Sequence, residues 1–295
     1  MKVHLVDGTY ELFRQFYGQA GRSSSPTAAA AGVVASTLQL VAAGATHIGV
    51  ASDHVVESFR NDLWPGYKTS DGMDAEILEQ IPVMEDALRA CGFTVWAMVE
   101  HEADDALGSA AAVAAADPRV AQVVIVTPDK DLGQCVRGDR VVQFDRRKDE
   151  VIDEQAVIEK FGVPPSSIVD YLALVGDSAD GFPGLPGWGA KSAARVLARF
   201  GTLDAVPDDA AEWGIEGLRG AERLAAALRE GREDAALFRR LATVVEDLDV
   251  GVVDDWMWRG PTDQFANVAG SLGVPELAVR AERVAAGGDV RASRR

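Results

Sequence analysis

The feature that most constrains the fold is an alternation of strand-like and helix-like segments through roughly the first 160 residues. Apolar and β-branched runs predict strands at residues 46–52, 93–98 and 122–126, after a first buried strand that ends at Asp7. Helical patterns lie between these runs, at residues 11–17, 28–43, 75–91 and 103–116. Alternation of this kind predicts an α/β domain with a mostly parallel sheet.

The chain changes character after about residue 163, where strand-like patterns end. Helical patterns follow at residues 168–175, 191–200, 220–229 and 232–243, interrupted by a Pro- and Gly-rich segment at residues 181–189. We therefore predict an α/β domain over residues 1–163 and a helical domain over residues 164–295.

Composition indicates a folded chain that stays out of membranes. Hydrophobic residues make up 47% of the sequence, which is enough for a sizeable core. No apolar run reaches the length of a membrane span, so we expect no membrane partner. Cys91 and Cys135 lie inside apolar patterns and are expected to be buried thiols, which fits a cytoplasmic location.

The net charge of -17 argues against general nucleic-acid binding, because phosphate binding favours Lys and Arg. The argument weakens if many of the carboxylates converge on metal ions. Bound divalent cations would then attract phosphate where the bare carboxylates repel it. The positions of the acidic residues therefore decide the matter.

Acidic residues follow several predicted strands directly. Asp7 and Asp53 end the first two strands, and further acids come after the later strands, namely Glu102, Asp104, Asp105, Asp129 and Asp131. Ligands of open α/β sheets bind beyond the carboxyl ends of the strands. One acid at such a place is more often a helix N-cap than a ligand, but a set of them on one edge predicts a metal site.

The chemistry of this set is that of hard oxygen ligands, which suit Mg²⁺ or Mn²⁺. No cluster of His or Cys competes, and the sequence has neither a glycine-rich nucleotide loop nor a nucleophile elbow. Two divalent ions can orient a water and stabilise both oxygens of an in-line phosphoryl displacement. The set therefore predicts a nuclease or a phosphatase.

The Gly-rich segment of the second half separates these two options. Its glycines expose backbone amides next to a predicted helix N-terminus, where a phosphate can bind. Lys191, Arg195 and Arg199 follow at i, i+4 and i+8 on one helix face. A tight helix–helix turn with a solvated basic face is the simpler alternative. A phosphatase for small substrates has no need of such a grip, so we favour a nuclease that binds duplex DNA.

These residues together resemble the bacterial 5′-nuclease family, which includes the 5′-3′ exonuclease domain of DNA polymerase I and the flap endonucleases. The matching stretches are residues 5–8 with Arg14 and Phe16, then residues 59–68, 102–105, 127–132 and 171–191. The last stretch is the most specific, and the resemblance becomes faint after about Thr243. It implies a Rossmann-like, PIN-like catalytic domain at residues 1–163 and a helix–three-turn–helix DNA-binding module within residues 164–295. No polymerase domain follows, so the resemblance is to a stand-alone member.

The resemblance also implies roles for single residues. The first metal ion would be held by Asp7, Asp53, Glu102 and Asp104, and the second by Asp129, Asp131, Asp177 and Asp180, with Asp105 close by. Lys68 would contact the scissile phosphate. The DNA-binding set would comprise Gly184, Gly187, Gly189, Lys191 and Arg195, with K⁺ at the loop. The implied activity is structure-specific 5′-3′ exonuclease and flap endonuclease cleavage in DNA replication and repair.

The chain departs from the family at two positions. Asp71 stands where a basic residue is usual, and Phe13 stands where Tyr is common. Two other interpretations remain open. A PIN-like ribonuclease would share the carboxylates but not need the Gly-rich module, and a non-catalytic junction-binding relative would lack some of the metal ligands.

Overall fold

The computed structural model describes residues 1–19 and 25–287, which form two compact units. The sheet unit comprises Met1–Val56, Ser70–Thr127 and Val245–Arg295, and the helical unit comprises Glu57–Thr69 and Pro128–Val244. The chain thus enters the helical unit twice. The predicted boundary at residue 163 stays a prediction, because these units group segments by packing and not by function.

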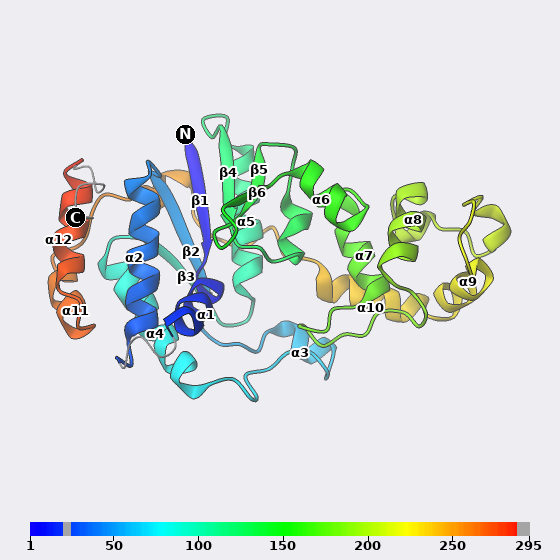
Figure 1. Ribbon diagram of the computed structural model, residues 1–295, viewed down its shortest axis with the longest axis horizontal. Helices are drawn as coiled ribbons and strands as arrows, with labels where there is room; N and C mark the ends of the chain where they lie inside the picture. The colour runs from blue at the N-terminus through cyan, green and yellow to red at the C-terminus, as the bar shows by residue number, and fades with distance from the viewer. Residues whose placement is uncertain (20–24, 288–295) are drawn as a thin grey trace. The chain divides into compact units, whose positions relative to one another are not determined.

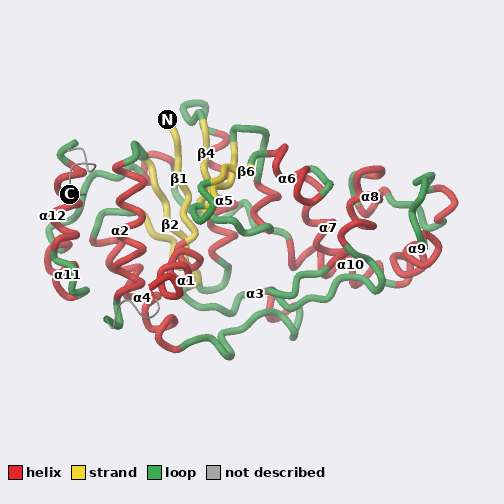
Figure 2. The backbone as a smooth tube through the Cα atoms, in the orientation of Figure 1, coloured by secondary structure: helices red, strands yellow, loops and turns green. Residues whose placement is uncertain are grey.

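The sheet unit contains four parallel strands. They lie in the order β3 (Thr94–Met98), β2 (His47–Asp53), β1 (Lys2–Asp7) and β4 (Gln122–Val126), each hydrogen-bonded to the next (Figure 2). The apolar side chains of β1, β2 and β4 are buried on both faces, as parallel strands covered by helices require, whereas the residues of the edge strand β3 are half-buried. The predicted mostly parallel sheet is confirmed.

Helices cover this sheet in the way that the alternating sequence predicts. The elements are α1 (Gly8–Gln19), α2 (Ala28–Ala42), α4 (Ala75–Ala90), α5 (Ala103–Ala116), the 3₁₀ turn η5 (Val253–Trp256), α11 (Phe265–Ser271) and α12 (Glu276–Ala285). Helix α5 packs across all four strands. Helices α1 and α4 also contact strands, and α2 packs on these two helices (Figure 1). The last two helices, which the sequence did not predict, return to pack on α2 and α4.

The helical unit contains a small hairpin and five helices of eight residues or more among its described residues. Its elements are α3 (Phe59–Leu63), η1 (Asp131–Cys135), β5 (Val141–Asp145), β6 (Glu150–Ile152), α6 (Glu154–Phe161), η2 (Pro165–Ser167), α7 (Ile168–Val175), α8 (Ala190–Phe200), η3 (Leu203–Ala205), η4 (Ala210–Glu212), α9 (Ala221–Glu230) and α10 (Arg232–Ala242). Helices α7, α8, α9 and α10 confirm the predicted helical patterns. The sequence analysis did not predict the hairpin β5–β6, whose second strand has only three residues.

The core of the helical unit is aromatic. Phe182 stacks on Phe238 of α10 with ring centroids 5.7 Å apart, and Trp188 packs against the fully buried Trp213. Helix α10 also packs along α7. It therefore contacts both α7 and, through Phe238, the loop that follows α7. Over the described part of the chain, no helix has the length and apolarity needed to cross a membrane.

Candidate metal centre and nucleic-acid interface

Two of the predicted acids end neighbouring parallel strands of the sheet unit. Asp7 ends β1 and is in register with Ala51, two residues before Asp53 at the end of β2. The Oδ1 atom of Asp7 accepts the Tyr10 N–H at 2.8 Å, and its Oδ2 atom accepts the Thr127 hydroxyl at 3.0 Å. These bonds fix a buried carboxylate at the carboxyl edge of the sheet, where ligands bind.

The remaining acids of the sheet unit gather at the N-terminus of α5. Glu102 is the buried N-cap residue of this helix, and the first backbone N–H of α5, from Ala103, donates to Oδ1 of Asp53 at 2.8 Å. The second strand end is thereby tied to the helix start. Asp104 is half-buried in the first turn, where negative charge is favoured.

Asp105 is held by backbone groups on both of its oxygens. Oδ2 accepts the Glu102 N–H at 3.0 Å, and Oδ1 accepts the Val245 N–H at 2.9 Å. The side chain therefore closes the capping box of α5 and anchors the returning chain. Its role as a metal ligand stays a prediction.

The acids of the helical unit come from two loops far apart in sequence. Asp129 is exposed, and its Oδ1 atom accepts the Asp131 N–H at 2.9 Å, which opens η1. Gln134 then donates from Nε2 to the carbonyl oxygens of Asp131 and Ala242, at 2.7 and 2.9 Å. The carboxylate of Asp131 is consequently held inside the unit, 7% exposed.

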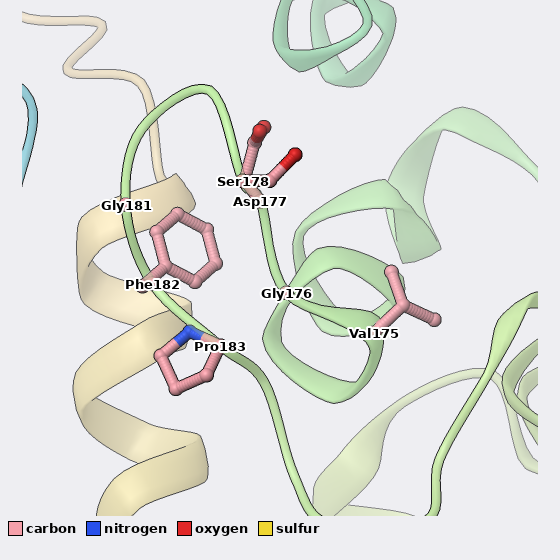
Figure 3. A pocket seen from close by; sticks show the side chains of 7 residues that line it. All are labelled: Val175, Gly176, Asp177, Ser178, Gly181, Phe182 and Pro183. Atoms are coloured by element: carbon pink, nitrogen blue, oxygen red, sulfur yellow. The ribbon is translucent and has the colours of Figure 1, made fainter.

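The second loop follows α7 and turns back at once. Asp177 and Phe182 exchange backbone hydrogen bonds, at 2.8 and 3.0 Å, and Oδ1 of Asp177 accepts the Ala179 N–H at 2.9 Å. The loop lines a pocket of about 400 Å³, in which the Asp177 and Ser178 side chains point away from the Phe182 ring (Figure 3). Asp177 and Asp180 are both buried.

Three buried carboxylates of the helical unit converge here. Asp131, Asp177 and Asp180 each present an oxygen within 4.8 Å of the others, a set that could hold a metal ion. Burial and the neighbouring carboxylates, first Asp129 and then Asp180, raise the pKa of Asp131 well above its ordinary value. Oδ1 of Asp131 is buried without a hydrogen-bond partner among the described residues. An all-oxygen set with an unsatisfied buried acceptor fits a hard divalent ion.

Lys68 is brought to this set by a close crossing of two backbones. Its Nζ lies 3.1 Å from Oδ1 of Asp180, and its N–H donates to the Asp180 carbonyl at 3.0 Å. The indole of Trp64 donates to the Gly181 carbonyl at 3.0 Å. A Cβ on Gly181 would lie 2.0 Å from the Gly66 carbonyl oxygen, so only glycine permits this approach.

We predict that Gly181→Ala impairs the protein far more than Gly201→Ala. Both glycines have left-handed φ, +84° and +80°, so both changes cost about 1 kcal/mol in backbone strain. A Cβ on Gly201 meets nothing within 4 Å, whereas the one on Gly181 must push the Gly66 backbone away. Denaturant unfolding of both variants measures the difference, expected to exceed about 2 kcal/mol. Equal losses would show that the crossing is loose.

The Gly-rich loop between α7 and α8 forms the predicted turn. A Cβ on Gly184 would lie 2.3 Å from the Gly176 nitrogen, so the middle of the loop packs closely against its first residue. Gly189 is the N-cap residue of α8 and its N–H donates to Oγ of Ser192 at 3.0 Å. Gly187 and Lys191 are exposed. The loop thus presents backbone and an ammonium group to solvent at a helix N-terminus.

The structure gives two arginines of this region different surroundings. Arg195 donates to the carbonyl oxygens of Gly217, at 3.0 Å, and Glu216, so part of its guanidinium holds the segment before α9. Arg223 of α9 is exposed, and a Cβ on Gly187 would lie 3.6 Å from its Nε. Sequence analysis missed Arg223, because it lies 36 residues beyond Gly187 and no local pattern links the two.

Two family models together match residues 2–264 of the chain. Residues 2–162 match the model of the N-terminal resolvase-like domain of 5′-3′ exonucleases, and residues 163–264 match that of their C-terminal SAM fold. The chain belongs to the 5′-3′ exonuclease family. This membership confirms the resemblance found in the sequence motifs.

Curated relatives of this family member fall into two kinds. The DNA polymerase I of Pseudomonas aeruginosa is 34% identical over 90% of the chain, which spans only 29% of that protein. The 5′-3′ exonuclease of Aquifex aeolicus is 29% identical, with 86% of this chain and 85% of that protein covered. The chain therefore spans most of one kind of relative and less than a third of the other.

Solved structures share the fold of this family member. T5 5′-exonuclease with bound zinc superposes with a TM-score of 0.66 at 19% identity, covering 96% of this chain and 98% of that one. The catalytic core of Rad2 in complex with DNA superposes with a TM-score of 0.62 at 14% identity, covering 96% and 92%. The predicted combination of an α/β nuclease-type domain with a helical module is confirmed.

Proposed function

We propose that this chain is a structure-specific 5′-nuclease that hydrolyses DNA phosphodiesters at 5′ flaps, nicks and 5′ ends of duplexes. The observation that carries the proposal is the buried all-oxygen set of Asp131, Asp177 and Asp180 in a member of the 5′-3′ exonuclease family. Structures of similar fold are described with DNA and metal ions, which supports the same partners here. Such an activity serves DNA replication and repair.

Mg²⁺ or Mn²⁺ is the proposed cofactor. In this proposal Asp7, Asp53, Glu102 and Asp104 hold one ion, and Asp129, Asp131, Asp177 and Asp180 hold a second, with Asp105 supporting the α5 N-terminus. Divalent ions bound there would supply an activated water and stabilise charge on the leaving oxygen. The chain's own contribution is to hold the carboxylates in place through the backbone bonds described above.

Lys68 is the proposed phosphate contact. Its ammonium group lies beside Asp180, and its side chain is 29% exposed. The ammonium group can therefore reach a phosphate oxygen of a bound substrate. A positive charge at that point stabilises the charge that develops on the phosphate during cleavage. Asp71, which replaces a basic residue usual in the family, leaves Lys68 as the only Lys or Arg between Trp64 and Gln80.

The proposed grip on the duplex backbone consists of the loop at residues 184–189, Lys191 and Arg195. The loop is also the proposed binding site for K⁺. Backbone amides and ammonium groups bind phosphates and not base edges, so binding should be indifferent to sequence and sensitive to salt. The proposed cytoplasmic location rests on the two buried thiols, Cys91 and Cys135.

Arg223 is expected to be part of this grip, since its guanidinium borders Gly187. We predict that Arg223→Gln weakens duplex binding roughly 3- to 10-fold and lowers the slope of log affinity against log salt by about one. Arg229→Gln is the matched control, because Arg229 is also exposed on α9 but lies six residues on, on another face. Fluorescence anisotropy with calcium in place of magnesium measures both. Equal losses would remove Arg223 from the interface.

The test of the function is cleavage of an end-labelled 5′-flap DNA with Mg²⁺, Mn²⁺ or a chelator. Release of the flap in either metal and none in chelator is expected. Undiminished cleavage in chelator would contradict the proposed metal-dependent mechanism. A matched RNA flap in the same assay separates the ribonuclease alternative, and binding without any cleavage would indicate a non-catalytic relative.

A further inference from the structure

Two lysines enter the buried acidic set of the helical unit, and only one of them has a proposed role. The ammonium group of Lys68 pairs with Asp180. That of Lys130 pairs with Oδ2 of Asp177 and lies 3.9 Å from Oδ1 of Asp131. Each carboxylate of the set therefore has an ammonium group within reach.

Lys130 occupies an unusual position in the sequence as well. It lies between Asp129 and Asp131, so it is the direct sequence neighbour of two proposed ligands. Its side chain nevertheless reaches the other loop, 47 residues further along the chain, to meet Asp177. About a third of the side chain is exposed, so its flexible four-carbon stem has a route to solvent.

Without a nearby cation, the buried acidic set would destabilise the folded protein. Asp131, Asp177 and Asp180 are buried residues whose carboxylate oxygens lie within 4.8 Å of one another, and their negative charges repel strongly because little water screens them. An ammonium group at this place offsets the repulsion as a divalent ion would.

We propose that Lys130 is an internal counter-cation of the metal site: it holds Asp177 and Asp131 together when no ion is bound, and a divalent ion displaces it. This inference rests on the proposed function for the site itself. It adds that metal affinity is set by competition between the ion and the protein's own ammonium group. It also adds that the ligands are kept in place before metal arrives.

The test is Lys130→Met, which keeps the length of the stem and removes the charge. Titration of Mn²⁺, followed by electron paramagnetic resonance, is expected to show about tenfold tighter binding to one class of sites, because the competitor is gone. Asp131→Asn should abolish that class and so identify it. Lys148→Met is the matched control, since Lys148 lies on the surface of the same unit, 4.0 Å from Glu150.

Thermal unfolding gives a second, independent measurement. In chelator, Lys130→Met should melt roughly 2–4 °C below the Lys148→Met control, because the repulsion is no longer offset. The stabilisation on adding Mg²⁺ should be larger in Lys130→Met than in the wild type. Lys130→Arg should behave like the wild type, and Lys130→Gln provides a polar variant if Lys130→Met does not fold.

The outcomes separate the two proposals. If the wild type binds no Mn²⁺, the metal site and with it the proposed function fail. If it binds Mn²⁺ and Lys130→Met matches the Lys148→Met control in affinity, the site stands and the counter-cation role is overturned. Weaker Mn²⁺ binding by Lys130→Met would likewise contradict competition, and would mean that Lys130 only orders the ligands.

Discussion

Asp131→Asn is expected to lower the cleavage rate of a 5′-flap DNA by at least about 10²-fold and yet to raise the stability of the metal-free protein. Asparagine has the shape of aspartate but is a neutral, weaker ligand, so the proposed second ion loses a carboxylate. The same change removes one of three buried negative charges that repel one another. Burial and Asp129 raise the pKa of Asp131, which means that the charged form of this carboxyl is unfavourable in the folded protein.

Asp170→Asn is the matched control for this prediction. Asp170 is another buried aspartate of the helical unit, but its oxygens are taken by Arg239 Nε at 2.8 Å and by the Leu203 N–H at 3.1 Å. Removing its charge should leave cleavage nearly unchanged, because Asp170 is not part of the acidic set. Thermal melts in chelator and single-turnover rates in Mg²⁺ measure both variants. A similar loss of rate in both would mean that Asp131 supports the fold and does not bind metal.

Lys68→Ala is expected to reduce the single-turnover rate about 10²-fold while DNA affinity in calcium falls by only a few-fold. The reason is that one ammonium group adds little to a many-contact interface but acts directly where charge develops on the phosphate. Two arginines, Arg60 and Arg14, are the candidates to replace this charge, and both are engaged in other contacts. Arg60 is buried and donates to the carbonyls of Leu241 and Thr243, and Arg14 pairs with Glu11 at 2.6 Å.

Lys191→Ala supplies the opposite pattern and therefore serves as the control. It should weaken DNA binding, yet leave the single-turnover rate unchanged once the protein saturates the substrate. A Lys68→Ala rate within a few-fold of the wild type would show that another group handles the scissile phosphate. A loss confined to affinity would move Lys68 to the binding surface.

Local sequence determined the framework of the sheet unit and the places of its acids. Strands that are continuous apolar, Val-rich runs alternate with helices of period 3.6, and parallel strands bring their carboxyl ends to one edge. The sequence pattern alone therefore places Asp7 and Asp53 at that edge, and the register of β1 with β2 agrees. The same local signals predicted α7 and α8 on either side of the Gly-rich loop, because glycine and proline end helices in a recognisable way.

Sequence patterns did not determine which charged groups meet, because those contacts depend on segments that are far apart in the chain. Lys68 reaches Asp180 only because two backbones touch at Gly66 and Gly181, an approach that no periodicity records. Lys130 reads as one of a run of charged residues, and its partner Asp177 is supplied by the fold of another loop. Side chains at such crossings are chosen by distance and burial in three dimensions, whereas the sequence alone shows only neighbours along the chain. The tertiary structure therefore decided how the charges are paired, and the sequence decided which charges were there to pair.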